Sequence, residues 1–333
     1  MITKKYWLLS VLILAIFTLS CEKDDDPVEI INEAEVLVEY LESTDSPLMK
    51  DYVSSDMPSI MGAVEVKTLN TTGQVYILDI RPAADFATGH IENAVNVTLG
   101  NILTHIEGVD LSPYTKVAIV CYSGQTAGFA ASILRIMGYD KAYSMKWGMC
   151  SWNETFVEGW NTTVSNGNAY ATQFVSTATE KGVKGDLPTL STGATTGEAI
   201  LEARISSVLA ADYTPAKISN TEVFNNKDNY YIINYWPADH YADPGHIPGA
   251  MQYTPKESMK MATDLTTLPT DKTIVVYCYT GQTSSFLAAY LRILGYDAKS
   301  LLYGTNGMIY DKMVAKELTT FSESQIMGYD YVQ

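Results

Sequence analysis

The chain has 333 residues, 47% of them hydrophobic and 18% charged, and its 22 Lys and Arg against 38 Asp and Glu give a formal net charge of -16 at pH 7. This composition is typical of globular proteins and excludes a disordered or collagen-like chain. The acidic balance argues against DNA or RNA binding, which needs a basic surface. At about 150 residues per domain, the length predicts two domains.

The first segment, residues 1–20, has the layout of a secretory signal. Two lysines precede an apolar run over residues 6–19, which is short for a membrane span. Cys21 follows this run and resembles the lipidated cysteine of bacterial lipoproteins, although Thr18 stands where a Leu is usual. The alternatives are an uncleaved anchor and a plain signal with an incidental cysteine.

Residues 21–32 begin with an acidic run over 22–26 and are expected to be a solvated tether. A chain this acidic is repelled by anionic lipid headgroups. We therefore expect an exported protein that is held in the bacterial cell envelope, at the outer membrane, only by a lipid on Cys21. Acidic residues directly after such a cysteine resemble the surface-export tag of some Gram-negative lipoproteins, which favours the cell surface.

Local patterns predict strands and helices in two similar stretches of the chain. The predicted elements are a helix over 33–41, strands over 75–80 and 117–120, a helix over 127–137, a strand over 141–144, a helix over 197–211, strands over 230–235 and 273–277, a helix over 284–294 and a strand over 298–302. The strands are short apolar, β-branched and aromatic runs of the kind that a parallel sheet buries on both faces. Strand, loop, helix and strand in this order predict α/β domains, each with a central, mostly parallel sheet flanked by helices.

The two stretches are copies of one another. The segment around His90 recurs around His246, and the hexapeptide CYSGQT at 121–126 recurs as CYTGQT at 278–283. A nearly constant offset of 156 to 157 residues indicates that a whole domain was duplicated.

The duplication sets the expected boundaries. We expect a first domain over 33–164 and a second over 197–333. The segment between them, 165–196, is rich in Gly, Ser, Thr and Asn and is expected to be a linker.

Each repeated hexapeptide places a cysteine where a buried strand gives way to a helix. Backbone N–H groups and the helix N-terminus surround the sulfur of Cys121 or Cys278 there with partial positive charge. Both effects favour the thiolate and would hold an anion above the sulfur. With Cys21 acylated, three cysteines remain, so at least one thiol should stay free.

As a set, these motifs resemble the tandem form of the rhodanese-like family. The features that carry the resemblance are the strand end at Asp79 and Arg81, the Gly-His-Ile turns at His90 and His246, and the two cysteine loops. The resemblance covers roughly residues 55 to 160 and 215 to 315. It implies two rhodanese-like α/β domains and a sulfurtransferase or persulfide carrier that uses no cofactor.

In that family the loop cysteine takes a sulfane sulfur from a small donor and passes it to a thiol or to cyanide. The resemblance assigns this catalytic role to Cys121 and Cys278, which need no general base once the thiolate has formed. The cradle for the substrate would be Tyr122, Ser123, Gly124, Gln125 and Thr126 in the first copy and Tyr279, Thr280, Gly281, Gln282 and Thr283 in the second. Asp79, Arg81, His90 and His246 would be structural.

Two departures from the family pattern bear on the donor and on the second copy. Both loops are uncharged, which weakens the binding of anionic donors and favours neutral or protein-bound persulfide donors. Asn234 and Trp236 stand in place of Asp79 and Arg81, so the second copy is expected to lose an ion pair.

Other functions are less consistent with the sequence. A phosphatase would need an arginine six positions after the cysteine, where Ala127 and Ser284 stand. The spacing of the four His and four Cys predicts no metal site. Two alternatives stay open. The first is a catalytically silent module that binds a small anion, a thiol or a partner protein. The second is thiol redox sensing with Cys150, although we otherwise expect Cys150 to be an inert buried residue.

Overall fold

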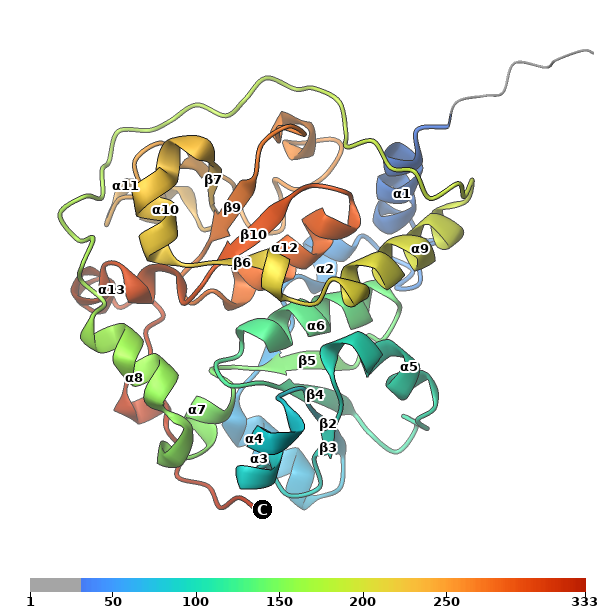
Figure 1. The fold of residues 1–333 in the computed structure, drawn as a ribbon, viewed down its shortest axis with the longest axis vertical. Coiled ribbons are helices and arrows are strands. Elements are labelled where there is room, and N and C mark those ends of the chain that lie inside the picture. The colour runs from blue at the N-terminus through green and yellow to red at the C-terminus, as the bar shows by residue number, and fades with distance from the viewer. Residues whose placement is uncertain (1–30) are drawn as a thin grey trace, which may run out of the picture. The chain divides into compact units, whose positions relative to one another are not determined.

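Two five-stranded sheets, one from each half of the chain, organise the structure (Figure 1). The computed structural model describes residues 31–333, so the expected signal, Cys21 and most of the tether lie outside the described residues. Residues 32–333 form one compact unit that contains both sheets. Within the described part of the chain, no helix is long and apolar enough to cross a membrane.

The first sheet has the strand order β1-β5-β4-β2-β3, with all neighbours parallel. Its strands are β1 (Ile60–Met61), β2 (Val75–Asp79), β3 (Val95–Asn96), β4 (Lys116–Val120) and β5 (Ala142–Met145). The second sheet repeats this order as β6-β10-β9-β7-β8, again parallel. Its strands are β6 (Lys217–Ile218), β7 (Tyr231–Asn234), β8 (Met251–Gln252), β9 (Ile274–Tyr277) and β10 (Ala298–Leu301). The prediction of two tandem α/β domains with parallel sheets is confirmed.

Helices flank both sheets. They are α1 (Glu33–Glu42), α2 (Tyr52–Asp56), α3 (Ala63–Thr71), α4 (Ala83–Thr88), α5 (Ile102–Glu107), α6 (Gln125–Ile136), α7 (Met149–Trp152), α8 (Glu158–Ser165), α9 (Gly197–Ala210), α10 (Asn220–Asn226), α11 (Ala238–Ala242), α12 (Gln282–Ile293) and α13 (Tyr310–Ala315). The helices after the cysteine loops, α6 and α12, begin two residues earlier than the apolar periodicity predicts, because their first residues, Gln and Thr, are polar.

The two halves meet where α6 packs against α12. Gly128 permits this close approach, since a Cβ at that position would lie 3.0 Å from the carbonyl oxygen of Gln282. The hydroxyl of Ser132 donates a hydrogen bond of 3.0 Å to the carbonyl of Phe286. Phe129 and Phe286 belong to the same cluster of buried apolar side chains. One hydrophobic core therefore extends through both halves.

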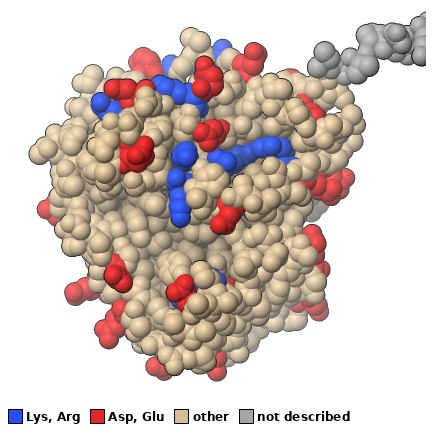
Figure 2. All heavy atoms as spheres, in the orientation of Figure 1, with Lys and Arg blue, Asp and Glu red and all other residues tan. Residues whose placement is uncertain are grey.

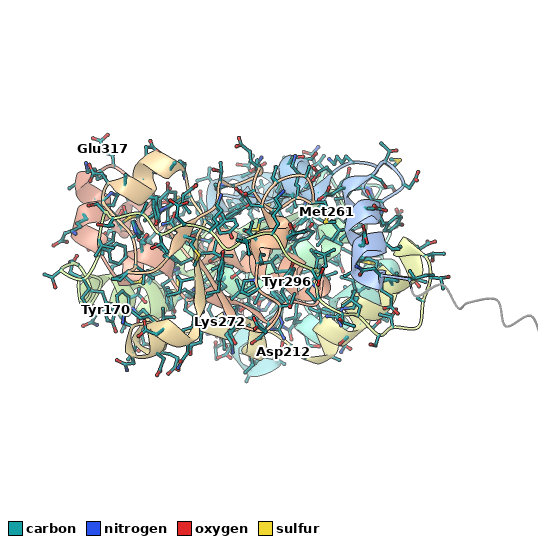
Figure 3. The ribbon with its side chains drawn as sticks, turned by 90° about the horizontal axis from the view of Figure 1, so that it is seen from above. Tyr170, Asp212, Met261, Lys272, Tyr296 and Glu317 are labelled. Carbon is teal, nitrogen blue, oxygen red and sulfur yellow. The ribbon has the colours of Figure 1, made fainter. Side chains whose placement is uncertain are left out.

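The helices that introduce the two copies, α1 and α9, also pack against each other. The ring of Tyr40 lies so close to Gly197 that a Cβ there would meet it at 2.4 Å. At the end of α1, the carboxylate of Glu42 accepts a hydrogen bond of 2.8 Å from the backbone N–H of Met261, which lies beside this helix in Figure 3. The first half thus contributes a helix to the packing of the second.

The segment between the copies, residues 166–196, runs along the outside of the second half between α8 and α9 (Figure 1). Val175 pairs with His246 through two backbone hydrogen bonds of 2.9 Å. Lys181 forms an ion pair of 2.7 Å with Asp264. The expected linker is therefore fastened to the surface of the second half.

The C-terminal residues return to the first half (Figure 1). Val332 exchanges backbone hydrogen bonds of 2.8 and 2.9 Å with His90. The indole N–H of Trp152 donates to the carbonyl of Asp330 at 2.9 Å. The end of the segment that we expected in the second domain, 197–333, thus packs on the first.

Candidate functional site

Cys121 lies at the end of β4, directly before the loop that leads into α6. Its Sγ accepts hydrogen bonds from the backbone N–H groups of Gly124, at 3.2 Å, and Ala127, at 3.3 Å. The loop closes around the sulfur because Gly124 adopts φ of +85°, which favours glycine. Cys121 is 3% exposed. The loop therefore surrounds a buried sulfur with N–H donors.

The ionisation of Cys121 differs from the sequence expectation. Burial raises the pKa of the Cys121 thiol above its ordinary value, since a buried thiolate loses its solvation. The N–H groups of Ala127, Ser123 and Gly124 lower this pKa, and the charge of Asp79 raises it. The effect of burial is the largest of these, so the pKa of the Cys121 thiol lies above its ordinary value.

Cys278 occupies the equivalent place after β9 and is 2% exposed. Its Sγ accepts a hydrogen bond of 3.4 Å from the N–H of Ser284 and lies 3.6 Å from the hydroxyl of the same residue. That hydroxyl bonds Ser300 at 2.7 Å. The first copy has Ala127 in place of Ser284, so only Cys278 is tied into a buried hydroxyl network.

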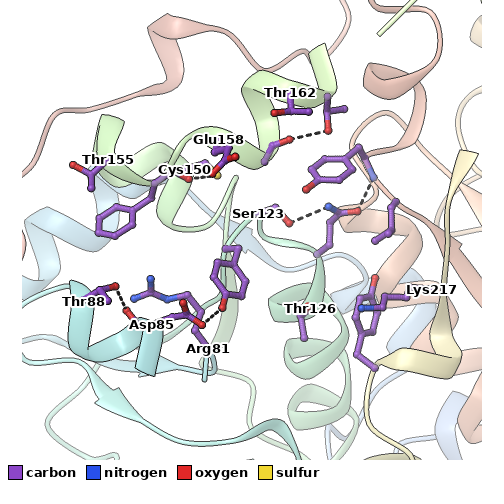
Figure 4. A pocket seen from close by; sticks show the side chains of 18 residues that line it. Arg81, Asp85, Thr88, Ser123, Thr126, Cys150, Thr155, Glu158, Thr162 and Lys217 are labelled. Atoms are coloured by element: carbon purple, nitrogen blue, oxygen red, sulfur yellow. Dashed lines mark hydrogen bonds between the residues drawn. The ribbon is translucent and has the colours of Figure 1, made fainter. Parts of the chain in front are cut away.

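A pocket of about 760 Å³ opens beside the loop of Cys121 (Figure 4). The side chains that line it come from both halves of the chain. They include Arg81, Asp85, Tyr122, Ser123, Gln125, Thr126, Cys150 and Glu158 from the first half and Tyr213, Lys217, Leu302 and Tyr303 from the second. Tyr122 is 49% exposed, and its hydroxyl donates a hydrogen bond to Asp85. The pocket has the size of a site for a small organic molecule.

The surroundings of the second loop are aromatic. Tyr279, equivalent to Tyr122, packs against the buried ring of Trp236 with 5.0 Å between centroids. Its hydroxyl bonds Nδ1 of His240. Asn306 donates a hydrogen bond of 2.7 Å to the carbonyl of Tyr279. Side chains of its own half thus enclose the ring that follows Cys278.

Asp79 and Arg81 form a buried ion pair below the first loop. Arg81 donates to both carboxylate oxygens of Asp79 at 2.6 to 3.1 Å and to the carbonyl of Gly89 at 2.7 Å. In the second half, the amide of Asn234 donates to the hydroxyl of Tyr277 at 2.9 Å, and no charge is present at either position.

The imidazoles of His90 and His246 bond the backbone. Nδ1 of His90 lies 2.9 Å from the carbonyl oxygen of Phe86, and Nδ1 of His246 lies 2.8 Å from that of Tyr241. Each ring also stacks on that partner's ring, with 3.6 Å between centroids. Neither histidine lines the pocket beside Cys121.

Gln125 and Gln282, which we expected in the substrate cradles, cross the boundary between the halves. Oε1 of Gln125 accepts a hydrogen bond of 2.6 Å from the N–H of Tyr303. Oε1 of Gln282 accepts one of 3.2 Å from the N–H of Trp147. Both glutamines are almost fully buried, although Gln125 also borders the pocket.

The remaining loop residues differ in their placement. Ser123 and Thr126 line the pocket. The hydroxyl of Thr280 accepts a hydrogen bond of 3.2 Å from the N–H of Gln282, at the start of α12. Gly281 adopts φ of +77° like its counterpart Gly124. Thr283 is half-buried in the first turn of α12.

Sequence reasoning missed the contribution of the second half to the pocket, above all Lys217. This residue begins β6, more than ninety positions after Cys121, and no local motif marks it. Glu158, at the start of α8, was missed for the same reason. Among the described residues, no group of three or more His, Cys, Asp and Glu side chains is placed to hold a metal ion.

Comparison with protein-family models matches the Rhodanese-like domain twice, over residues 63–155 and 221–309. Among curated proteins, the thiosulfate sulfurtransferase GlpE of Shewanella oneidensis is 35% identical over 80 residues, which are 24% of this chain and 77% of that protein. The adenylyltransferase and sulfurtransferase uba4 of Ogataea parapolymorpha is 26% identical over 90 residues, 27% of this chain and only 23% of that protein.

Solved structures give weaker matches. A thiosulfate sulfurtransferase from Pseudomonas aeruginosa shows 16% identity and a TM-score of 0.30, covering 87% of this chain and 48% of that one. SseA from Escherichia coli, described as a 3-mercaptopyruvate sulfotransferase, shows 17% identity and a TM-score of 0.27, covering 75% of this chain and 98% of that one.

Proposed function

The chain belongs to the rhodanese-like domain family and contains two tandem copies of the domain, and from this premise we propose that it is a sulfurtransferase whose working cysteine is Cys121. The single observation that carries the choice of Cys121 is the pocket of about 760 Å³ beside its loop. Tyr122, Ser123, Gln125 and Thr126 of this loop line the pocket. They directly follow Cys121, whose sulfur accepts hydrogen bonds from two N–H groups of the loop.

The proposed reaction begins when the Cys121 thiol releases its proton to solvent. The thiolate then attacks the outer sulfur of a donor such as thiosulfate, the sulfur–sulfur bond of the donor breaks, and sulfite leaves with the electron pair of that bond. Cys121 becomes a persulfide. The N–H groups of Gly124 and Ala127 stabilise the negative charge on sulfur during the attack.

In the second step a nucleophile accepts the outer sulfur. Cyanide or a thiolate attacks that sulfur, the bond to Cys121 breaks, and thiocyanate or a new persulfide leaves while Cys121 returns to the thiol by taking up a proton. No other protein group has to donate or accept a proton, because the leaving groups are weakly basic and the pocket is open to solvent.

Cys278 has a supporting role in this proposal. Its hydrogen bonds to Ser284 and the enclosed ring of Tyr279 favour a packed loop over one that exchanges small molecules. The second half instead supplies part of the wall of the first pocket.

A catalytically silent binding module is the second candidate, and the raised pKa of the Cys121 thiol favours it. Such a module would use the same pocket to hold a small anion, a thiol or a partner protein without forming a persulfide. Replacement of Cys121 by Ser would then leave its function intact.

Peptide mass spectrometry distinguishes the two candidates. The chain lacking residues 1–21 is exposed to thiosulfate and, separately, to a small persulfide, alongside the variants Cys121→Ser and Cys278→Ser. The proposal expects one added sulfur atom on the Cys121 peptide, removable by cyanide, in the parent chain and in Cys278→Ser. Bare thiols with every donor would overturn sulfur transfer and leave the binding module.

We also propose that the protein is exported and anchored in the bacterial cell envelope by a lipid on Cys21. The apolar run over 6–19 and the cysteine that follows it support this proposal. Incorporation of a labelled fatty acid into the parent chain, and not into Cys21→Ser, is the expected result. Equal labelling, or none in either, would contradict it.

A further inference from the structure

A smaller cavity lies in the second half, between α9 and the end of α12. Its volume is about 210 Å³. It is lined by Arg204, Ser207 and Val208 of α9 and by Arg292, Tyr296 and Asp297 at the end of α12 and after it. No described residue lines both this cavity and the pocket beside the loop of Cys121. The cavity is therefore distinct from the site of the proposed function.

The guanidinium of Arg292 bonds protein groups through one of its nitrogens. Nη1 donates to the carbonyl oxygens of Ala298, at 3.2 Å, and Pro215, at 3.4 Å, and to the carboxylate of Asp297 at 3.3 Å. Among the residues that the structure describes, Nε and Nη2 have no hydrogen-bond partner, and neither is sealed from solvent. These two nitrogens form the fork through which an arginine binds two oxygens of one oxyanion.

The equivalent arginine of the first half, Arg135, has a carboxylate at this place. Arg135 and Arg292 are related by the offset that relates the two cysteine loops. Nη1 of Arg135 bonds the carbonyl of Ala142, and Nη2 donates to the buried carboxylate of Asp56. Asp56 also forms an ion pair of 2.8 Å with Lys50. The first half thus holds a carboxylate between two cations.

The second half has a tyrosine where the first has this carboxylate. The edge strands β1 and β6 begin four residues after Asp56 and Tyr213, which therefore hold equivalent places. The hydroxyl of Tyr213 bonds Ser285 at 2.8 Å. Asp297 contacts Nη1 of Arg292 and not Nη2. Within the described part of the chain, no carboxylate thus bonds Nη2 of Arg292.

Arg204 brings a second cation to the cavity. Its Nε and Nη2 donate to the carbonyl oxygens of Ile293, at 2.9 Å, and of Arg292, at 2.7 Å, so its guanidinium lies beside the end of α12. Nη1 bonds no described residue and is open to solvent. Ser207 lies three residues further along α9 and therefore on the same face of this helix.

The electrostatics of the two arginines favour an anion. Burial lowers the pKa of the Arg204 guanidinium, and the charge of Arg292 lowers it further. Glu33 raises this pKa, but its carboxylate accepts hydrogen bonds of 2.8 and 2.9 Å from the N–H groups of Thr192 and Gly193. The two guanidinium groups therefore repel each other, and an anion bound to both would offset this repulsion.

The wider surface has the same polarity. On the face shown in Figure 2, Lys and Arg side chains gather over the second half around β6 and α9, and Asp and Glu predominate over the first half. Positive charge is thus concentrated near the cavity of a chain whose formal net charge is -16. Such a local field draws anions toward the cavity.

We propose that this cavity binds a phosphate group, held by Nε and Nη2 of Arg292, Nη1 of Arg204 and the hydroxyl of Ser207. Four donors match a tetrahedral oxyanion, which offers more acceptor oxygens than a carboxylate. A sphere of the cavity's volume is about 7 Å across, so an ion of this size can contact side chains on more than one wall. The proposal does not depend on sulfur transfer at Cys121.

Isothermal titration calorimetry on the chain lacking residues 1–21, at low ionic strength, tests the proposal with inorganic phosphate. We expect one phosphate to bind per chain and acetate to bind about tenfold more weakly, as the loss of one charge-assisted hydrogen bond allows. Arg204→Gln should weaken phosphate binding about tenfold for the same reason. Binding of methyl phosphate beside phosphate would assign an ester as the ligand, and binding of phosphate alone would assign the free ion.

A matched pair of serine substitutions tests the site while leaving both arginines in place. Ser207→Asp puts a carboxylate among the cations, as Asp56 does in the first half, and should weaken phosphate binding at least about tenfold. Ser206→Asp makes the same change of charge at an adjacent exposed serine that does not line the cavity. This control should change the affinity by no more than about twofold. Circular dichroism checks that both variants fold.

The outcomes decide on the site independently of the proposed function. Absence of phosphate binding, equal affinity for acetate, or equal effects of Ser207→Asp and Ser206→Asp would overturn the phosphate site. None of these results bears on the addition of sulfur to Cys121, which is measured separately.

Discussion

Oε1 of Gln125 in the first half accepts a hydrogen bond of 2.6 Å from the backbone N–H of Tyr303 in the second. Gln125→Ala leaves this N–H without its acceptor at the boundary between the halves. Tyr303 is half-buried, and an N–H that loses its acceptor in a buried setting costs about 1–3 kcal/mol, so we expect the lower part of this range. We expect the free energy of unfolding, measured by chemical denaturation, to fall by this amount, and Gln282→Ala to have a similar effect through Trp147.

Gln74→Ala is the matched control, because Gln74 is exposed and its backbone makes the sheet contacts. This substitution should change the free energy of unfolding by no more than about 0.5 kcal/mol. If Gln125→Ala were as mild as this control, the contact with Tyr303 would contribute nothing measurable.

The raised pKa of the Cys121 thiol predicts how reactivity depends on pH. Only the thiolate reacts, and burial keeps the pKa above the ordinary value of about 8.5. Alkylation of Cys121 by iodoacetamide, which does not titrate, should therefore accelerate about tenfold per pH unit from pH 6 to pH 8. The rate at the Cys121 peptide is measured by mass spectrometry. A plateau below pH 8 would show a thiolate of low pKa instead.

The buried pair of Asp79 and Arg81 predicts an asymmetric mutational effect. Arg81→Met leaves the Asp79 carboxylate buried without a counter-charge, which costs about 3–5 kcal/mol. The double variant Asp79→Asn with Arg81→Met removes both charges and should recover most of this loss, since Asn234 holds the equivalent place in the second half. Chemical denaturation of Arg81→Met, of Asp79→Asn and of the double variant gives the free energies of unfolding that a double-mutant cycle requires.

The common core predicts that residues 32–333 unfold in a single transition. Phe129 and Phe286 belong to one buried cluster, so unfolding of one half would expose apolar side chains of the other. Calorimetry should give one peak with equal calorimetric and van't Hoff enthalpies. A fragment over 33–164 should expose apolar surface and bind a hydrophobic dye. Two separate peaks would show that the halves are energetically independent.

Cys150 borders the pocket, but its environment predicts low reactivity. Its thiol donates a hydrogen bond of 3.0 Å to the carbonyl of Phe156, and burial raises the pKa of Cys150 to about 12. We expect Cys150→Ser to leave the rate of sulfur addition to Cys121 within about twofold. Mild oxidation should form no disulfide between the two residues, and a Cys121–Cys150 disulfide seen in peptide mapping would support redox sensing.

Local sequence patterns predicted the elements that depend on nearest neighbours. The expected strands over 75–80 and 117–120 match β2 and β4 within one residue at each end, and the helix over 197–211 matches α9. Burial on both faces imposes continuous apolar runs on such strands, and these are visible without tertiary information. The two-residue strands β1, β3, β6 and β8 were missed because they are too short to show a period.

The candidate site was predicted only in part, for a physical reason. A strand, a cysteine and a helix start are neighbours in the chain, so the loop of Cys121 could be recognised. Lys217 reaches the pocket through the packing of two domains, and the burial of Gln125 depends on Tyr303 in the other copy. The pKa of Cys121 depends on how deeply the tertiary fold buries its sulfur, and the loop sequence alone does not show this depth.

The reciprocal contacts of Gln125 and Gln282 have an evolutionary consequence. Gln125 of the first copy contacts Tyr303 of the second, and Gln282 of the second copy contacts Trp147 of the first. Such a reciprocal pair of contacts is the pattern of a two-fold symmetric dimer interface. A single-domain ancestor could form the same pair of contacts between two identical subunits. Once fused in one chain, the two surfaces were free to diverge. The equivalent places hold Arg81 in the first copy and Trp236 in the second, and the second copy supplies Tyr213, Lys217 and Tyr303 to the wall of the pocket beside the loop of the first.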